Sequence, residues 1–216
     1  MKTHLLWDHD GVLVDTEPLY YEATRQCIAA LGITLGLDEY LIDMVDGTPA
    51  WDKARAIGVA EEDVIAAREA RDNLYQRLLQ QESIEIPGVV DILQELAKSY
   101  QMAIVTTAKR TDFELIHRQR HPQRQIVANM QFVLASGDYA RAKPHPDPYL
   151  TALARFTVEP AQALVIEDSE RGLRAAVAAG IDCVVVDNAF TRGQNFSAAQ
   201  HRIKSLAELP ALLTSI

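Results

Sequence analysis

Two aspartates with a single residue between them, Asp8 and Asp10, are the residues whose types and spacing point most directly to chemistry. They follow the apolar run 5–7 and precede Gly11. On an extended strand, side chains at i and i+2 point the same way, so we expect both carboxylates to leave one side of a sheet edge. Neighbouring carboxylates repel unless a cation or a proton lies between them. The pair therefore indicates a divalent-metal site or a nucleophile with an acid/base partner, with a solvated Asp-Gly turn as the simpler alternative.

An alternation of helix and strand patterns beyond residue 87 predicts the scaffold that positions this pair. Short apolar runs predict strands at 4–8, 102–106, 132–134, 163–167 and 183–186, and helical periodicity predicts helices near 88–98, 111–120, 147–156 and 170–179. Continuous apolar strands that alternate with helices are typical of a parallel sheet covered on both faces. We therefore expect an α/β fold with a Rossmann-like parallel sheet.

The stretch 16–85 has a purely helical pattern. Residues 17–31 and 61–81 carry apolar side chains at helical spacing, and two shorter helical stretches flank 46–49. We expect an all-helical domain inserted after the first strand, with residues 1–15 and 86–216 forming the α/β core.

The carboxyl ends of the predicted strands carry further polar residues. Ligands bind outside these ends in open parallel sheets. Thr106 and Thr107 end one strand, Glu167 and Asp168 end another, and Lys143 lies in a proline-rich loop before a helix. Together they suit a divalent cation beside a phosphoryl group. Taken singly, each has a plainer explanation as a strand end, a solvated charge or a helix cap.

Over essentially its whole length, the chain resembles the haloacid dehalogenase-like phosphohydrolases. The branch is that of beta-phosphoglucomutase and the small sugar-phosphate phosphatases, subfamily I with a helical C1 cap. Four ordered motifs carry the resemblance: WDHDGVLVDTE at 7–17, IVTTAKR at 104–110, AKPHPDPYL at 142–150 and VIEDSERGLRAAVAAG at 165–180. The resemblance implies that residues 16–85 form the cap.

The resemblance also implies the catalytic roles. Asp8 is the nucleophile that becomes an aspartyl-phosphate, and Asp10 is the general acid for the leaving alcohol and then the base for water. Asp10 must then hold its proton above the ordinary Asp pKa of about 3.9. Asp8, the backbone carbonyl of Asp10 and Asp168 hold Mg²⁺, and Glu167 supports the metal through water or from a second layer.

The phosphoryl group is expected to contact a second set of residues. By the same resemblance, Thr106 and the amide of Thr107 hydrogen-bond its oxygens, and Lys143 neutralises charge on it and on Asp8. Residues that we expect to set specificity are Tyr20, Thr48, Trp51 and Lys53 in the cap and Lys109 and Arg110 after the second motif. A place in the core of the cap is the alternative for Trp51.

Departures from the mutase pattern favour hydrolysis. Mutases carry a histidine where this chain has Tyr20, an arginine in the region of Pro49 and Ala50, and often a serine at Ala108. A missing arginine removes a bidentate grip on a second phosphate. We therefore expect a Mg²⁺-dependent phosphatase of a small phosphorylated metabolite, with sugar phosphates as candidates. A phosphohexose mutase and a non-catalytic binding module remain alternatives, and a dehalogenase is disfavoured because it gives Asp10 and Asp168 no role.

The composition and net charge of the chain limit the kinds of partner that we expect. The chain has 216 residues, 48% of them hydrophobic, and a net charge of −9, which argues against a nucleic-acid surface. No apolar run is long enough to cross a bilayer, and the apolar segment near the start is too short for a signal peptide, so we expect no membrane partner and a cytoplasmic location. We expect a monomer or a weak homo-oligomer, with Cys27 and Cys183 as reduced core thiols.

The remaining polar residues lie outside the motifs. We expect the side chain of His9 to point to the face opposite its neighbours and to pack there. His117, His121, His145 and His201 show no metal-ligand spacing and are expected at the surface. The polar segment 118–125 is expected to be a solvated loop.

Overall fold

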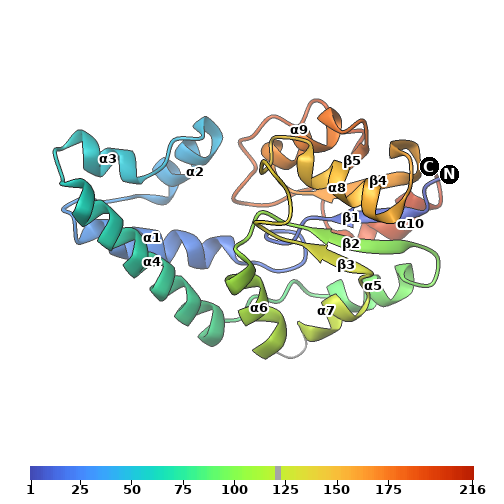
Figure 1. Ribbon diagram of the computed structural model, residues 1–216, viewed down its shortest axis with the longest axis horizontal. Coiled ribbons are helices and arrows are strands. Elements are labelled where there is room, and N and C mark those ends of the chain that lie inside the picture. The colour runs from blue at the N-terminus through green and yellow to red at the C-terminus, as the bar shows by residue number, and fades with distance from the viewer. Residues whose placement is uncertain (120–122) are drawn as a thin grey trace. The chain divides into compact units, whose positions relative to one another are not determined.

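The computed structural model describes residues 1–119 and 123–216, and these divide into two compact units (Figure 1). An α/β unit comprises Met1–Asp15, Glu85–Ala189 and Gln194–Ile216, and a helical unit comprises Thr16–Ile84 and Phe190–Gly193. The segment Phe190–Gly193, expected in the core, belongs to the helical unit because Phe190 packs against the hydrophobic cluster of that unit.

Six parallel strands form the sheet of the α/β unit, which confirms the expected fold class. They are β1 (His4–Trp7), β2 (Gln101–Val105), β3 (Phe132–Leu134), β4 (Ala163–Glu167), β5 (Asp182–Val186) and β6 (His201–Ile203), in the order β3-β2-β1-β4-β5-β6. Trp7 lies opposite both Ile104 and Ile166. The three central strands therefore end at nearly the same level and bring the residues that follow them together.

Helices cover both faces of this sheet (Figure 1). On one side lie α5 (Val89–Leu96), α6 (Arg110–Gln119) and α7 (Arg124–Ala128), and on the other α8 (Asp147–Phe156) and α9 (Glu170–Ala178). Leu6, Val105 and Val165 of the sheet share a buried cluster with Tyr149 of α8 and Leu173 of α9. Full burial of such an aliphatic side chain contributes about 1.5–3 kcal/mol, so this cluster fixes α8 and α9 on the sheet.

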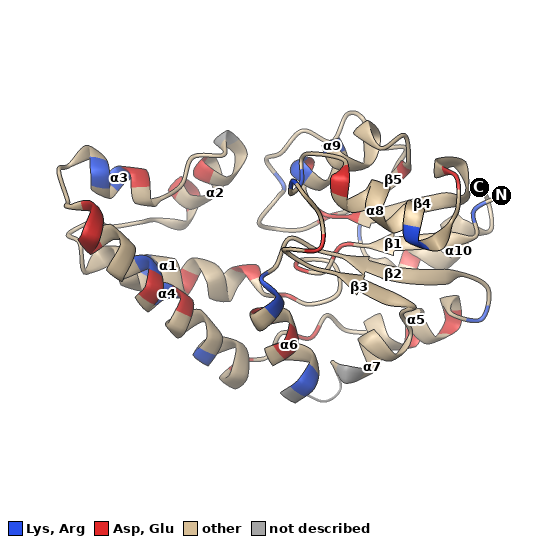
Figure 2. Cartoon of the chain, in the orientation of Figure 1, with Lys and Arg blue, Asp and Glu red and all other residues tan. Residues whose placement is uncertain are grey.

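The helical unit consists of α1 (Glu17–Ala29), α2 (Leu37–Asp46), α3 (Trp51–Ala56) and α4 (Glu61–Gln81). The hydrophobic core of this unit includes Ile28 of α1, Trp51 of α3 and Val64 of α4, all of them buried. Acidic and basic residues are interspersed along α3 and α4 (Figure 2). Among the described residues, no helix has the length and apolar character needed to cross a membrane.

Several elements differ from the expectation. α7, β6 and α10 (Leu209–Leu213) were not expected, and neither were the short 3₁₀ helices Pro160–Gln162 and Leu206–Glu208. The solvated loop expected at 118–125 is wrong for its described part, because α6 extends to Gln119, Gln123 is buried and Arg124 begins α7. The buried side chain of Ile126 anchors α7. Residues 120–122 of that segment lie outside the described residues.

Candidate active site

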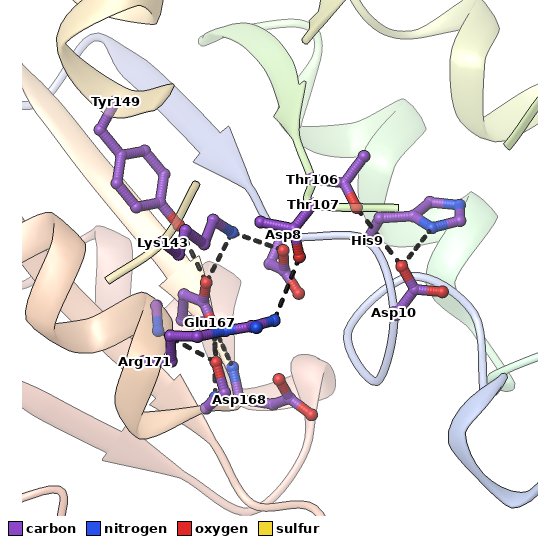
Figure 3. Close-up of polar contacts among 12 residues, drawn as sticks. Asp8, His9, Asp10, Thr106, Thr107, Lys143, Tyr149, Glu167, Asp168 and Arg171 are labelled. Carbon is purple, nitrogen blue, oxygen red and sulfur yellow. Dashed lines mark hydrogen bonds and ion pairs between the residues drawn. The ribbon is translucent and has the colours of Figure 1, made fainter. Parts of the chain in front are cut away.

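The ends of three neighbouring strands bring polar side chains to one edge of the sheet (Figure 3). Asp8 follows β1, and its amide donates to the carbonyl of Ile166 at 2.9 Å. Thr106 follows β2, and its amide donates to the carbonyl of Leu134 at 2.9 Å. Glu167 is the last residue of β4. Sheet hydrogen bonds thus hold the backbone of the first two residues, which limits the motion of their side chains.

Lys143 binds two carboxylates at this edge. Its Nζ atom donates to Asp8 Oδ1 at 2.5 Å and to Glu167 Oε1 at 2.7 Å, and the side chain is only 2% exposed. Burial by itself would lower the pKa of Lys143, but the two carboxylates outweigh it and raise the pKa above its ordinary value. Lys143 is therefore a buried, charged residue, and the alternative of a solvated loop charge is excluded.

Glu167 is fully buried and hydrogen-bonded at both oxygens. Oε1 accepts from the Tyr149 hydroxyl at 3.0 Å, in addition to Lys143. Oε2 accepts from the amides of Asp168 and Ser169, both at 3.1 Å, and from Ser169 Oγ at 2.9 Å. Burial would raise the pKa of Glu167, but Lys143 and these hydrogen bonds hold it below its ordinary value. Glu167 is thus an ionised residue that positions its neighbours.

Two glycines leave room for the carboxylates. Gly11 has a φ of 79°, and a Cβ there would overlap the carboxylate of Asp168 and crowd the amide of Asn188. A Cβ at Gly172, in the first turns of α9, would overlap the carboxylate of Glu167. Gly11 of the first motif and Gly172 of the fourth are therefore required by close approach of a carboxylate, and Gly11 also by its positive φ.

Three carboxylates form a group that could hold a metal ion. Asp8, Glu167 and Asp168 are buried, and each offers an oxygen within 4.8 Å of the others. Burial and the charge of Glu167 raise the pKa of Asp8 to about 7, against the attraction of Lys143. One lysine therefore balances this group incompletely, and a divalent cation would favour the ionised form of Asp8. Oxygen donors of this kind fit a hard cation such as Mg²⁺.

Asp10 has partners different from those of Asp8. β1 ends at Trp7, so the alternation of an extended strand does not reach these aspartates. The Oδ2 atom of Asp10 accepts from Thr106 Oγ1 at 3.3 Å and lies 3.2 Å from His9 Nδ1. The two carboxyl groups therefore have separate environments, which suits two different roles.

His9 and His117 form a buried pair that sequence reasoning missed. His9 is fully buried and packs against Phe113, with ring centroids 4.8 Å apart, which agrees with its expected packing role. The expected direction away from its neighbours is wrong, because its Nδ1 atom contacts Asp10. Its Nε2 atom lies 2.8 Å from His117 Nε2, and His117 Nδ1 lies 2.9 Å from the carbonyl oxygen of Gln123. The expected surface position of His117 is wrong. Burial and the neighbouring His9 lower the pKa of His117 to about 4. Of the other histidines, His145 is exposed, His201 is half-buried and His121 lies outside the described residues.

Arg171 is a further residue that the sequence analysis did not single out. It is exposed in the first turn of α9, and its Nη2 atom donates to Thr107 Oγ1 at 3.1 Å (Figure 3). Its position in the fourth motif, three residues after Asp168, is the sequence feature that could have indicated a place near the site. Lys109 and Arg110 are exposed at the start of α6, and Arg110 forms an ion pair with an aspartate of the α/β unit.

The four residues of the helical unit that were expected to set specificity differ in burial and in contacts. Trp51 is buried in the hydrophobic core of that unit, as the alternative interpretation had it. Lys53 forms ion pairs with two acidic residues of α2, and Thr48 is exposed. Tyr20 is half-buried, and the guanidinium carbon of buried Arg71 lies 4.4 Å from the centre of its ring. Arg71 was not singled out by the sequence analysis.

The cysteines carry no disulfide. Both Cys27 and Cys183 are free thiols, as expected. Cys183 is buried, whereas Cys27 is only half-buried. Burial raises the pKa of both thiols, which disfavours the reactive thiolate form.

Comparisons with known proteins identify the family of this chain. The model of the haloacid dehalogenase-like hydrolase family matches residues 5–186. The chain is 32% identical to Protein CbbY of Cereibacter sphaeroides, over 96% of this chain and 94% of that protein. It is 31% identical to fructose-1-phosphate phosphatase YqaB of Escherichia coli, over 84% of this chain and 95% of that protein. A crystal structure of CbbY from Rhodobacter sphaeroides in complex with xylulose-1,5-bisphosphate has a TM-score of 0.78 at 30% identity, covering 97% of this chain and 96% of that one. The chain therefore belongs to the haloacid dehalogenase-like hydrolase family, among its phosphatases.

Proposed function

We propose that this protein is a Mg²⁺-dependent phosphatase that hydrolyses a small sugar phosphate through an aspartyl-phosphate on Asp8. The observation that carries the proposal is the buried contact of Lys143 with Asp8 and Glu167, beside the carboxylate of Asp168. A carboxylate nucleophile, a fixed cation and a metal-binding carboxylate are the groups that phosphoryl transfer needs. The proposed division into a core, residues 1–15 and 86–216, and a cap, residues 16–85, assigns substrate selection to the cap.

Mg²⁺ would be held by Asp8, the backbone carbonyl of Asp10 and Asp168. When bound, it supplies positive charge that stabilises the negative oxygens of the phosphoryl group. Asn188 Nδ2 donates to Asp168 Oδ2 at 2.8 Å, and this hydrogen bond orients the Asp168 carboxylate. Glu167 already accepts hydrogen bonds at both oxygens, so its role is to hold Lys143 and the start of α9.

The chain's own side chains can carry out two displacements. In the first, the Asp8 carboxylate attacks phosphorus, the bond from phosphorus to the ester oxygen breaks, and Asp10 gives its proton to the leaving alcohol. In the second, water attacks phosphorus, Asp10 takes a proton from that water, and Asp8 leaves as a carboxylate with release of phosphate. The Thr107 amide and Lys143 would bind the phosphoryl oxygens throughout, and Thr106 would bind them by turning its single hydroxyl hydrogen from Asp10 to the phosphoryl group.

The substrate class rests on the relatives and on the surrounding cations. One relative is named a fructose-1-phosphate phosphatase, and another structure contains a xylulose bisphosphate. In this chain, Arg171, Lys109 and Arg110 are exposed cations that we propose contact the phosphorylated sugar. In the helical unit we propose that Tyr20, Thr48, Trp51 and Lys53 set specificity.

A panel of phosphorylated metabolites tests the proposal. The wild-type protein is expected to release phosphate from sugar phosphates with Mg²⁺, to lose this activity in EDTA and to regain it when Mg²⁺ is restored. Isomerisation of a hexose 1-phosphate that depends on a bisphosphate primer would indicate a mutase instead. Absence of turnover for every ester, with intact folding shown by circular dichroism, would leave only a binding role. A cytoplasmic location and a monomeric or weakly oligomeric state stay predictions.

A further inference from the structure

A hydrogen-bonded series of buried groups connects Asp10 to the backbone near the start of α7. Asp10 Oδ2 lies 3.2 Å from His9 Nδ1, and His9 Nε2 lies 2.8 Å from His117 Nε2. His117 Nδ1 lies 2.9 Å from the carbonyl oxygen of Gln123. The imidazole of His9 and its contact with Asp10 are visible in Figure 3. None of the roles assigned to residues of the four motifs uses His9 or His117.

The carbonyl of Gln123 sets the order of hydrogens along this series. A carbonyl oxygen only accepts, so His117 Nδ1 must carry a hydrogen. In a neutral imidazole the other nitrogen is then an acceptor, and burial disfavours the charged form of His117. His9 must therefore donate from Nε2 to His117. The backbone at one end thus places a hydrogen on His9 Nε2, which leaves Nδ1 of a neutral His9 as an acceptor for the carboxyl hydrogen of Asp10.

Packing holds the two rings in place. His9 is fully buried, and Phe113 of α6 packs against both histidines, with ring centroids 4.8 Å from His9 and 4.4 Å from His117. Thr106 Oγ1 donates to the same oxygen of Asp10, at 3.3 Å. Asp10 Oδ2 is therefore contacted by two side chains that cannot move independently of the sheet and α6, which sets the orientation of the carboxyl plane.

We propose that His117, acting through His9, is a positioning residue that orients the Asp10 carboxyl group for proton transfer to the leaving alcohol. This inference rests on the proposed function, because it assigns Asp10 the role of general acid. Loss of His117 would leave the buried Nε2 hydrogen of His9 without its acceptor and allow the ring to rotate or change tautomer. The consequence is a misplaced acid with the nucleophile and the phosphate site unchanged.

The leaving group distinguishes this role from general destabilisation. An alkyl phosphate requires protonation of its leaving oxygen, whereas p-nitrophenolate departs readily without it. The parameter to compare is kcat/KM, because it reports the steps up to the first irreversible release of alcohol. His117→Phe should lower kcat/KM for the best alkyl phosphate of the metabolite panel by about tenfold more than kcat/KM for p-nitrophenyl phosphate.

Two variants serve as controls. His117→Gln can accept from His9 Nε2 through its side-chain oxygen and should restore most of the discrimination. Ile116→Val removes one buried methyl group from the same helix, so it should affect both esters equally. Equal losses for both esters in His117→Phe, with Asp8→Asn inactive, would overturn the inference and leave the proposed function standing. Hydrolysis of neither ester by the wild-type protein would overturn the proposed function itself.

Discussion

The Nζ atom of Lys143 lies 2.5 Å from Oδ1 of Asp8, although 135 positions separate the two residues in the sequence. A charge-assisted hydrogen bond between buried partners is strong, and it becomes costly when one partner is removed. Lys143 also contacts Glu167, so a single ammonium group holds together residues that follow or end two neighbouring strands. Stability and catalysis are therefore linked at this residue.

Replacement of Lys143 by Met should affect both properties. It leaves two buried carboxylates without their cation, which we expect to lower the free energy of unfolding by about 3–5 kcal/mol. Loss of a cation beside the phosphoryl group should reduce kcat/KM by about a hundredfold or more. Urea unfolding and steady-state kinetics measure the two effects. Arg25→Met, which removes an exposed ion pair with Glu22, should leave stability nearly unchanged. Wild-type activity in the Lys143 variant would contradict this account of the site.

Gly172 should be replaceable only at a cost, because a Cβ would overlap the Glu167 carboxylate. We expect Gly172→Ala to displace Glu167, to destabilise the protein by about 1–3 kcal/mol and to lower kcat. Thermal unfolding and kinetics measure these changes. Gly36→Ala is the matched control, since a Cβ there meets nothing within 4 Å and the φ of −77° is ordinary. Equal stability of the two variants would show that Glu167 tolerates the methyl group.

Features that depend on local sequence were predicted well. Apolar runs located five of the six strands, and three of the motifs contain Asp8, Lys143 and Asp168, which the structure brings to the same edge of the sheet. β6 was missed because its three residues include a histidine and an arginine, and only one of the three is buried. Contacts between distant segments, such as Tyr149 with Glu167, follow from the packing of α8 on the sheet and leave no local signal.

The burial of His117 had a local signal that was overlooked. Phe113, Ile116 and His117 lie at i, i+3 and i+4, which is the spacing of one helix face. All three are buried, so this face of α6 packs into the core. The helical spacing therefore predicts a buried position for His117, although histidine is a polar residue.

Stability should depend on pH through His117. The folded protein keeps this ring neutral until about pH 4, whereas in the unfolded chain it protonates near the ordinary pKa of 6.5. Between these values the unfolded state binds more protons at this ring, so the contribution of His117 to the free energy of unfolding should fall by about 3 kcal/mol as pH decreases from 6.5 to 4. The raised pKa of Asp8 gives a contribution of the opposite sign in this range. Urea unfolding at several pH values measures the slope. His117→Gln should remove the His117 contribution, so that stability relative to wild type rises as pH decreases, and His145→Gln, at an exposed position, should leave the wild-type slope unchanged. An unchanged slope in His117→Gln would assign the dependence to other groups.

Arg171 is expected to contribute to substrate binding. Its exposed guanidinium contacts Thr107, so Arg171→Gln should raise KM for a sugar phosphate by about tenfold with kcat nearly unchanged, the pattern of lost uniform binding. Arg174→Gln, at an exposed position of the same helix, should leave both parameters as they are. Unchanged KM in the Arg171 variant would remove this residue from the substrate contacts.

The most direct test of the central claim is to locate the phosphoryl group during turnover. The protein is mixed with Mg²⁺ and its best sugar phosphate, quenched in acid within the first turnovers, digested and analysed by mass spectrometry. The account predicts one phosphoryl group on the Asp8 carboxylate of the wild-type protein and neither phosphorylation nor turnover in folded Asp8→Asn. A phosphoryl group on another residue, or full turnover by Asp8→Asn, would contradict it.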